Sequence, residues 1–271
     1  MEQATGGDTP MEEAQDGPKK RSVPAVTRAV AILRALGKSD EPMGVQALAR
    51  ELDLVPSTVL HILRVLTDEG LVAFDSRTKR YSVDVGILAL ARSAIQKNAF
   101  VAVIQPRLDA LATEFGVTTI ATQFTDPTHM VVVALSQVQL PFRLQVDLGS
   151  RFPAMISGTG RCFAAFNPMD PAELRARFDR LVWDHAPDYD RWQSEAAETR
   201  ARGYAVDRGD YISGVTVTAV PFFDGAGRMV HSMVAIGITE RVDAIGPDRL
   251  ATAMMKVRDE AAGMLLPGGG A

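Results

Sequence analysis

Residues 45–66 read VQALARELDLVPSTVLHILRVL, and this stretch predicts two helices joined by a tight turn at 53–55. Apolar residues recur at helical spacing on both sides of the turn. Pro56 suits the first turn of the second helix, because a backbone N–H is not needed there. The positions that carry the pattern are Val45, Leu48, Ala49 and Leu52, then Val59, Ile62, Leu63 and Leu66. The stretch is therefore typical of a helix-turn-helix.

The flanking segments complete a small domain over residues 22–83. Upstream, apolar residues recur at helical spacing from Val26 to Leu36, which predicts a further helix. Downstream, two short apolar runs flank a polar turn at 75–80 that carries three cations, which predicts a β-hairpin. Three helices followed by a basic hairpin indicate a winged helix-turn-helix.

This domain has the chemistry of a DNA-binding module. A helix of about 10–12 Å diameter fits the major groove, and cations of the hairpin can meet phosphates. The residues expected to contact DNA are Gln46, Pro56, Ser57, Thr58, Leu60, His61 and Arg64 from the helices, and Arg77, Lys79 and Arg80 from the hairpin. The alternative is a sensor or adaptor whose helical module binds protein. A steep loss of affinity with salt would distinguish DNA binding, because counterions are released.

The net charge of −4 argues against a nucleic-acid partner only when it is averaged over the chain. Residues 1–18 contain five acidic residues and no Lys or Arg. Residues 19–82 contain eleven Lys or Arg against seven Asp or Glu. The basic segment therefore coincides with the winged domain, and the acidic start of the chain has too few apolar residues to fold.

The second half of the chain predicts an α+β domain with an antiparallel sheet. Two pairs of apolar runs flank polar turns near 126–129 and 224–228, which predicts two β-hairpins. A helix over 99–115 precedes them and is stopped by Gly116. Further helices are expected at about 159–167, 171–178, 190–202 and 247–265. Strands interleaved with helices in this way indicate a sheet flanked by helices.

No residue pattern supports catalysis, a metal site or a cofactor. The four histidines are scattered and none begins an HExxH spacing, and we expect His129 and His231 at the surface. Residues 157–161, SGTGR, match neither a P-loop nor a nucleophile elbow. A Gly-rich turn entering a helix can present backbone N–H groups to an anion or carbonyl, or can simply begin the helix. Cys162 follows inside that helix and is expected to pack in the core.

Two separated signatures resemble the IclR-type transcriptional regulators, over residues 22 to 266. The first is the helix-turn-helix and hairpin described above, preceded by VTRAVAIL at 26–33. The second comprises RGYAVD at 202–207, Gly214-Val215 and AVPFFD at 219–224. The resemblance implies a winged helix-turn-helix, a connecting helix and a GAF-like effector-binding domain. It also implies dimers or dimers of dimers.

The resemblance further implies an effector cleft between the Gly-rich turn and the sheet. Asp207 matches an Asp of the family's cleft, while Val217 stands at a Cys position and Met155 where His is common. The residues expected around the effector are Met155, Ser157, Gly158, Asp207, Val215, Val217, Val234 and Ile236. The apolar replacements favour a hydrophobic or aromatic effector, held at one end by Asp207 or backbone N–H groups, since a buried carboxylate without donors is costly. The alternative is that the valines and Ile236 only pack the core around a small or vestigial pocket.

The sequence thus predicts a DNA-binding regulator of a catabolic operon, controlled by a small molecule. Its expected partners are a double-stranded operator, the effector and further copies of the chain. No run approaches 18 apolar residues and the first 30 residues are polar, so no membrane contact is expected and the protein is placed in the cytoplasm. The expected division is a disordered acidic tail at 1–21, the winged helix-turn-helix at 22–83, a connecting helix at 84–98, the effector-binding domain at 99–267 and a flexible tail at 268–271.

Overall fold

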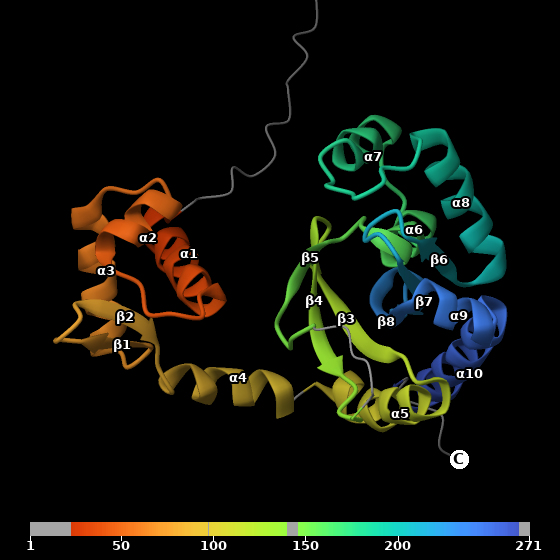
Figure 1. Cartoon of the computed structure of the whole chain (residues 1–271), viewed down its shortest axis with the longest axis horizontal. Coiled ribbons are helices and arrows are strands. Elements are labelled where there is room, and N and C mark those ends of the chain that lie inside the picture. The colour runs from red at the N-terminus through yellow and green to blue at the C-terminus, as the bar shows by residue number, and fades with distance from the viewer. Residues whose placement is uncertain (1–22, 97, 140–145, 266–271) are drawn as a thin grey trace, which may run out of the picture. The chain divides into compact units, whose positions relative to one another are not determined.

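The computed structural model describes residues 23–96, 98–139 and 146–265 (Figure 1). The chain divides into two compact units, and the boundary along the sequence lies between Ser93 and Ala94. The tails predicted at 1–21 and 268–271 lie outside the described residues.

The first unit contains the predicted three helices and hairpin. Its elements are α1 (Pro24–Lys38), α2 (Val45–Glu51), α3 (Pro56–Asp68), β1 (Val72–Asp75) and β2 (Arg80–Val83). The apolar faces of the helices meet in one core that includes Ile32, Leu48 and Leu63, none of them exposed. Asp53, in the turn between α2 and α3, has φ 50°, a conformation that a short polar side chain tolerates. The predicted winged helix-turn-helix is confirmed.

Helix α4 (Gly86–Gln96) crosses the boundary between the two units. It is shorter than the connecting helix predicted over 84–98. Three large apolar side chains in or next to its first half, Val85, Leu88 and Leu90, are more than half exposed.

The second unit is built on a six-stranded antiparallel sheet. Its strands are β3 (Thr118–Asp126), β4 (His129–Leu135), β5 (Arg151–Pro153), β6 (Ala205–Arg208), β7 (Val215–Phe223) and β8 (Met229–Ile238). They lie in the order β5-β4-β3-β8-β7-β6. Both predicted hairpins are present, β3 with β4 and β7 with β8, and β3 pairs with β8 to join them at the centre.

Helices cover the two faces of this sheet differently (Figure 1). Helices α5 (Ala99–Phe115), α9 (Thr239–Ile245) and α10 (Pro247–Leu265) pack on one face. Helix α6 (Ser157–Phe166) packs on the other, with α7 (Pro171–Phe178) and α8 (Tyr189–Arg202) outside it. Side chains along β8 alternate between the two resulting cores, so that Val234 faces α6 and Ala235 faces α5 and α10.

Three side chains of this unit can be compared with the predictions made for them. Cys162 is completely buried in α6, where burial raises the pKa of its thiol to about 12, so it packs as predicted. The prediction of a surface position is wrong for His231. Its ring stacks on Phe100 of α5 with ring centroids 4.0 Å apart, and burial lowers its pKa to about 4. His129 begins β4 and is half-buried.

Candidate nucleic-acid interface and ligand cavity

The solvent face of α3 carries the side chains predicted to contact DNA. Ser57, His61 and Arg64 are exposed, while Pro56, Thr58 and Leu60 are partly exposed beside them. On the opposite face of the helix Val59, Leu63 and Leu66 are buried in the core. Gln46 is exposed on α2. The fold therefore leaves the polar face of α3 available to a partner.

The β1–β2 turn presents two cations at its tip. Arg77 and Lys79 are exposed, and the turn is held by Asp75, whose carboxylate accepts hydrogen bonds from the Arg77 N–H (2.9 Å) and the Thr78 hydroxyl (2.7 Å). These bonds lower the pKa of Asp75, so the carboxylate stays ionised. The Lys79 ammonium lies 5.7 Å from the centre of the Phe74 ring. Both cations are therefore displayed from an ordered turn.

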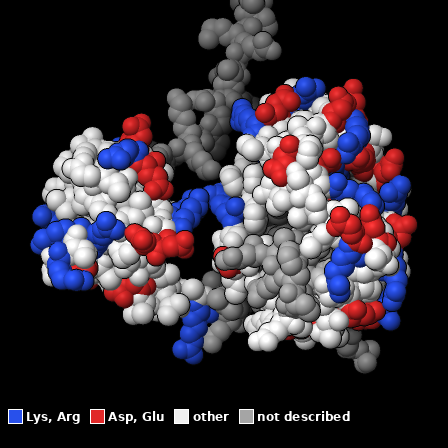
Figure 2. All heavy atoms as spheres, in the orientation of Figure 1, with Lys and Arg blue, Asp and Glu red and all other residues white. Residues whose placement is uncertain are grey.

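Arg80 differs from the other two cations of the hairpin. It belongs to strand β2 rather than to the turn, and its guanidinium donates a hydrogen bond to the backbone carbonyl of Pro42 at 3.2 Å. It also lies 3.6 Å from the Glu41 carboxylate. Figure 2 shows Lys and Arg atoms gathered at the left edge of the first unit in this view, where Figure 1 places this hairpin.

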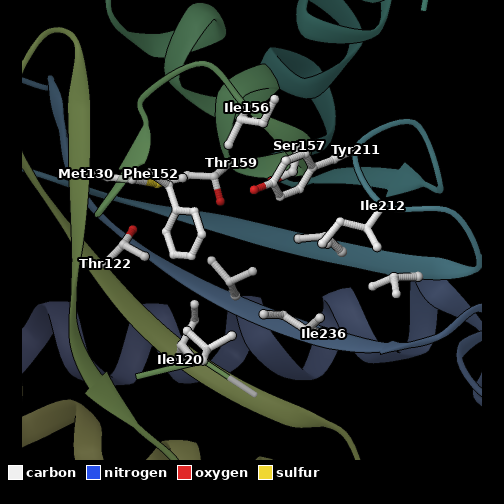
Figure 3. Close-up of a pocket in the computed structure, with 14 residues that line it drawn as sticks. Ile120, Thr122, Met130, Phe152, Ile156, Ser157, Thr159, Tyr211, Ile212 and Ile236 are labelled. Carbon is white, nitrogen blue, oxygen red and sulfur yellow. The ribbon is translucent and has the colours of Figure 1, made fainter. Parts of the chain in front are cut away.

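A cavity of about 150 Å³ lies on the α6 face of the sheet in the second unit (Figure 3). Strands β3, β7 and β8 form an apolar wall, and the start of α6 and the loop 209–214 close other sides. The described residues that line it are Ile120, Thr122, Met130, Val146, Phe152, Ile156, Ser157, Thr159, Tyr211, Ile212, Val215, Val217, Val234 and Ile236. Ten of these fourteen side chains are hydrocarbon or thioether, so the cavity is mainly apolar.

The polar groups of the cavity are hydroxyls. Ser157 and Thr159 come from the first turn of α6, where the N-cap residue Ile156 supplies no side-chain hydrogen bond. Thr122 lies on β3, is 1% exposed, and its hydroxyl has no hydrogen-bond partner among the described residues. Burial raises the pKa of Tyr211, so its phenol is neutral. The cavity can therefore hydrogen-bond a ligand without supplying a charge.

Five of the eight residues predicted around the effector meet at this cavity, namely Ser157, Val215, Val217, Val234 and Ile236. The structure places Met155, Gly158 and Asp207 outside its lining. Met155 is buried in the core beneath α6. Gly158 lies where α6 approaches β7, and a Cβ there would be 2.7 Å from the carbonyl oxygen of Val217. Its lack of a side chain thus permits close packing rather than ligand contact.

Asp207 instead belongs to a buried ionic cluster around Arg161. Arg161 is 1% exposed and contacts three carboxylates, those of Glu195 (2.7 Å), Asp207 (3.4 Å) and Asp210 (2.5 Å). Arg191 bonds to Glu195 and Asp210 from the solvent side. Burial raises the pKa of Asp207, and Arg161 opposes that rise.

This Arg161 cluster also fixes one wall of the cavity. Asp207 accepts hydrogen bonds from the backbone N–H groups of Asp210 (3.0 Å) and Tyr211 (3.4 Å). Tyr211 and the next residue, Ile212, line the cavity. Periodicity does not predict these two residues as cavity residues, because they lie in an irregular loop without a repeating pattern. Thr122 and Ile120 could have been found from their alternation on β3.

Among residues 23–96, 98–139 and 146–265, no three His, Cys, Asp or Glu side chains converge as metal ligands. No helix in these ranges is long and apolar enough to cross a membrane.

Each of the two units matches a domain of the same protein family. Residues 25–76 match the model of the IclR helix-turn-helix domain, and residues 92–264 match that of the bacterial transcriptional regulator IclR C-terminal domain. The HTH-type transcriptional repressor AllR of Klebsiella pneumoniae is 26% identical over 91% of this chain and 90% of its own length. The glycerol operon regulatory protein of Streptomyces griseus is 29% identical over 84% of this chain and 89% of its own.

The same fold has been solved. The crystal structure of an IclR transcriptional regulator from Alicyclobacillus acidocaldarius superimposes with a TM-score of 0.79 at 22% identity. The match covers 89% of this chain and 98% of that one.

Proposed function

The chain belongs to the IclR family of bacterial transcriptional regulators, and from this premise we propose how its residues divide the work of regulation. Helix α3 enters the major groove of an operator with Ser57, Thr58, His61 and Arg64 facing the bases, and Gln46, Pro56 and Leu60 beside them. Arg77 and Lys79 bind phosphates from the hairpin, while Arg80 supports the hairpin through Pro42. The observation that carries this proposal is the exposed polar face of α3 next to an ordered basic turn.

We propose that the regulator acts as a homodimer or a dimer of dimers in the cytoplasm, where the operator DNA lies. Two recognition helices would then meet half-sites of a pseudopalindrome. Self-association is supported by exposed apolar side chains, because burying them against another copy of the chain is favourable. They are Val26 and Val30 on α1, and Val85, Leu88 and Leu90 in or next to α4. The name of the Streptomyces griseus relative supports control of a catabolic operon.

The small-molecule effector binds in the cavity of the second unit, with Ser157, Val215, Val217, Val234 and Ile236 in contact with it. The cavity is of the size that holds one benzene ring, which supports a hydrophobic or aromatic molecule. The effector changes transcription only if it binds the DNA-competent and DNA-incompetent states with different affinities. The described residues support a role for the effector in controlling binding to an operator, rather than as a substrate that is turned over.

Selection of bound duplexes from a random-sequence pool would identify the operator, and substitutions would then test the docking. Arg64→Ala should cost about 1–3 kcal/mol on the selected operator and relax its sequence preference. Lys79→Ala should weaken all sequences alike and reduce the salt slope by about 1. Arg202→Ala, an exposed cation on α8, is the matched control and should change neither.

Unchanged binding in both DNA-domain variants would refute the proposed docking. Failure to enrich any duplex at low salt would favour the protein-binding adaptor.

A further inference from the structure

The described side chains that line the ligand cavity offer hydroxyls rather than charges. Its described lining has four oxygen-bearing side chains, Thr122, Ser157, Thr159 and Tyr211, and no charged one. Figure 3 shows the Thr159 hydroxyl pointing from α6 into the space above the apolar wall, and Thr122 on strand β3 across from it. A buried carboxylate would therefore lose its hydration without gaining a charged partner from these residues.

Among the described residues, the buried arginine that contacts a cavity residue is already paired with carboxylates. Arg161 donates a hydrogen bond to the backbone carbonyl of Ser157 at 3.2 Å, but its guanidinium also contacts the carboxylates of Glu195, Asp207 and Asp210. With Arg191 included, the Arg161 cluster holds three carboxylates against two guanidinium groups. The cluster contacts two cavity residues, Ser157 and Tyr211, and has no unpaired guanidinium to offer an anionic ligand.

Thr122 supplies a second, independent observation. A buried hydroxyl almost always has a hydrogen-bond partner, because leaving it without one is costly. The Thr122 hydroxyl has none among the described residues, although the side chain is 1% exposed and lines the cavity. A ligand that places a hydroxyl or carbonyl group beside Thr122 would satisfy it.

We propose that the effector is an uncharged molecule about one aromatic ring in size, bearing a hydroxyl or carbonyl group that hydrogen-bonds Thr122. Its ring packs on the wall formed by Ile120, Val217 and Val234. Ser157 and Thr159 at the start of α6 offer the other hydrogen bonds. This inference rests on the proposed function, because it takes the cavity as the effector site.

Calorimetric titration of the full chain with phenol, toluene and benzoate near neutral pH tests the inference. Phenol should bind most tightly and benzoate least. Thr122→Val keeps the side-chain volume but removes the hydroxyl, so it should weaken phenol binding by about tenfold and leave toluene binding unchanged or tighter. The matched control is Thr218→Val, since Thr218 is also a buried threonine without a described partner on this sheet, yet it does not line the cavity. It should change neither affinity.

Tightest binding of benzoate, equal phenol binding by the protein and its Thr122→Val variant, or binding of none of the three probes would each overturn the inference. Binding to the selected operator, measured in parallel, separates the two proposals. Intact operator binding without phenol binding refutes the ligand class and leaves the DNA-binding role standing. Phenol binding of the expected kind that leaves operator affinity unchanged supports the ligand class and contradicts its role as effector.

Discussion

Replacing Arg161 with methionine should remove the one guanidinium that neutralises the buried side of the Arg161 cluster. Asp207 is completely buried and the Asp210 side chain is 11% exposed, so neither carboxylate can regain full hydration. Removing one partner of a buried ion pair costs about 3–5 kcal/mol, because the remaining charge is left unpaired in a poorly hydrated place. We therefore expect Arg161→Met to lower the free energy of unfolding of the second unit by about that amount near neutral pH.

The loss should depend on pH in a direction that the structure defines. Burial already holds the pKa of Asp207 above its ordinary value of 3.8, and Arg161 is the main group that lowers it. Without Arg161 the folded-state pKa rises further above that of the unfolded chain. A raised pKa favours the folded state when the carboxyl is protonated, and this contribution is lost as the pH rises through the folded pKa. The deficit of the variant should therefore grow as the pH rises above the folded-state pKa of Asp207 in the unsubstituted protein, which itself lies above 3.8.

Urea unfolding followed by tryptophan fluorescence measures this deficit. Both tryptophans, Trp183 and Trp192, lie in the second unit, so the signal reports on that unit alone. Arg202→Met is the matched control, because Arg202 pairs with Glu198 at 3.1 Å but both are more than half exposed. Such a pair contributes less than about 1 kcal/mol. An Arg161→Met variant as stable as the control, or a deficit independent of pH, would refute the reasoning that unpaired buried carboxylates cause the loss.

Three further substitutions or reagents test the core. Maleimide should label Cys162, the single cysteine, only as fast as the protein unfolds near neutral pH, because burial raises its pKa to about 12; rapid labelling of the folded protein would contradict this. His231→Phe should move acid unfolding to lower pH. The pKa of His231 in the folded protein is about 4, below its ordinary value of 6.5. The unsubstituted protein therefore loses about 3 kcal/mol of stability as the pH falls from 6.5 to 4, whereas the variant has no such loss. Gly158→Ala should lower the free energy of unfolding, measured by calorimetry, by about 1–3 kcal/mol, because the added Cβ would meet the Val217 carbonyl. In the control Gly225→Ala the added Cβ meets nothing within 4 Å, so this variant should be as stable as the unsubstituted protein. Equal melting temperatures of the two variants would disprove the close approach at Gly158.

Local periodicity explains why most elements could be predicted. The apolar spacing in α1 and α3 predicts helices, and the long apolar runs of β7 and β8 on either side of a polar turn predict a hairpin. Strands β5 and β6, of three and four residues, are too short to show a pattern. The central pairing of β3 with β8 joins segments more than a hundred residues apart, and no local sequence pattern indicates such a contact.

The cavity lining was predicted correctly where the resemblance and strand alternation agree, and at Ser157, which begins α6. Val217 and Ile236 are paired across β7 and β8 and face the cavity, as their spacing indicates. Asp207 was assigned by resemblance to the cavity, yet its partner Arg161 is 46 residues away and turns the carboxylate toward the Arg161 cluster. His231 was expected at the surface because its burial depends on a contact with Phe100, which lies on a helix distant in the sequence.

The two-faced sheet has a consequence for how such a regulator can change its ligand. On β8, Val234 and Ile236 line the cavity, while Met233 and Ala235 pack under α5 and α10. A substitution at position 234 or 236 would alter what the cavity accepts, whereas one at position 233 or 235 would alter the packing under α5 and α10. Because adjacent residues of this strand face different cores, a single substitution can change the ligand preference of the cavity. The core under α5 and α10, and hence the fold, then stays unchanged.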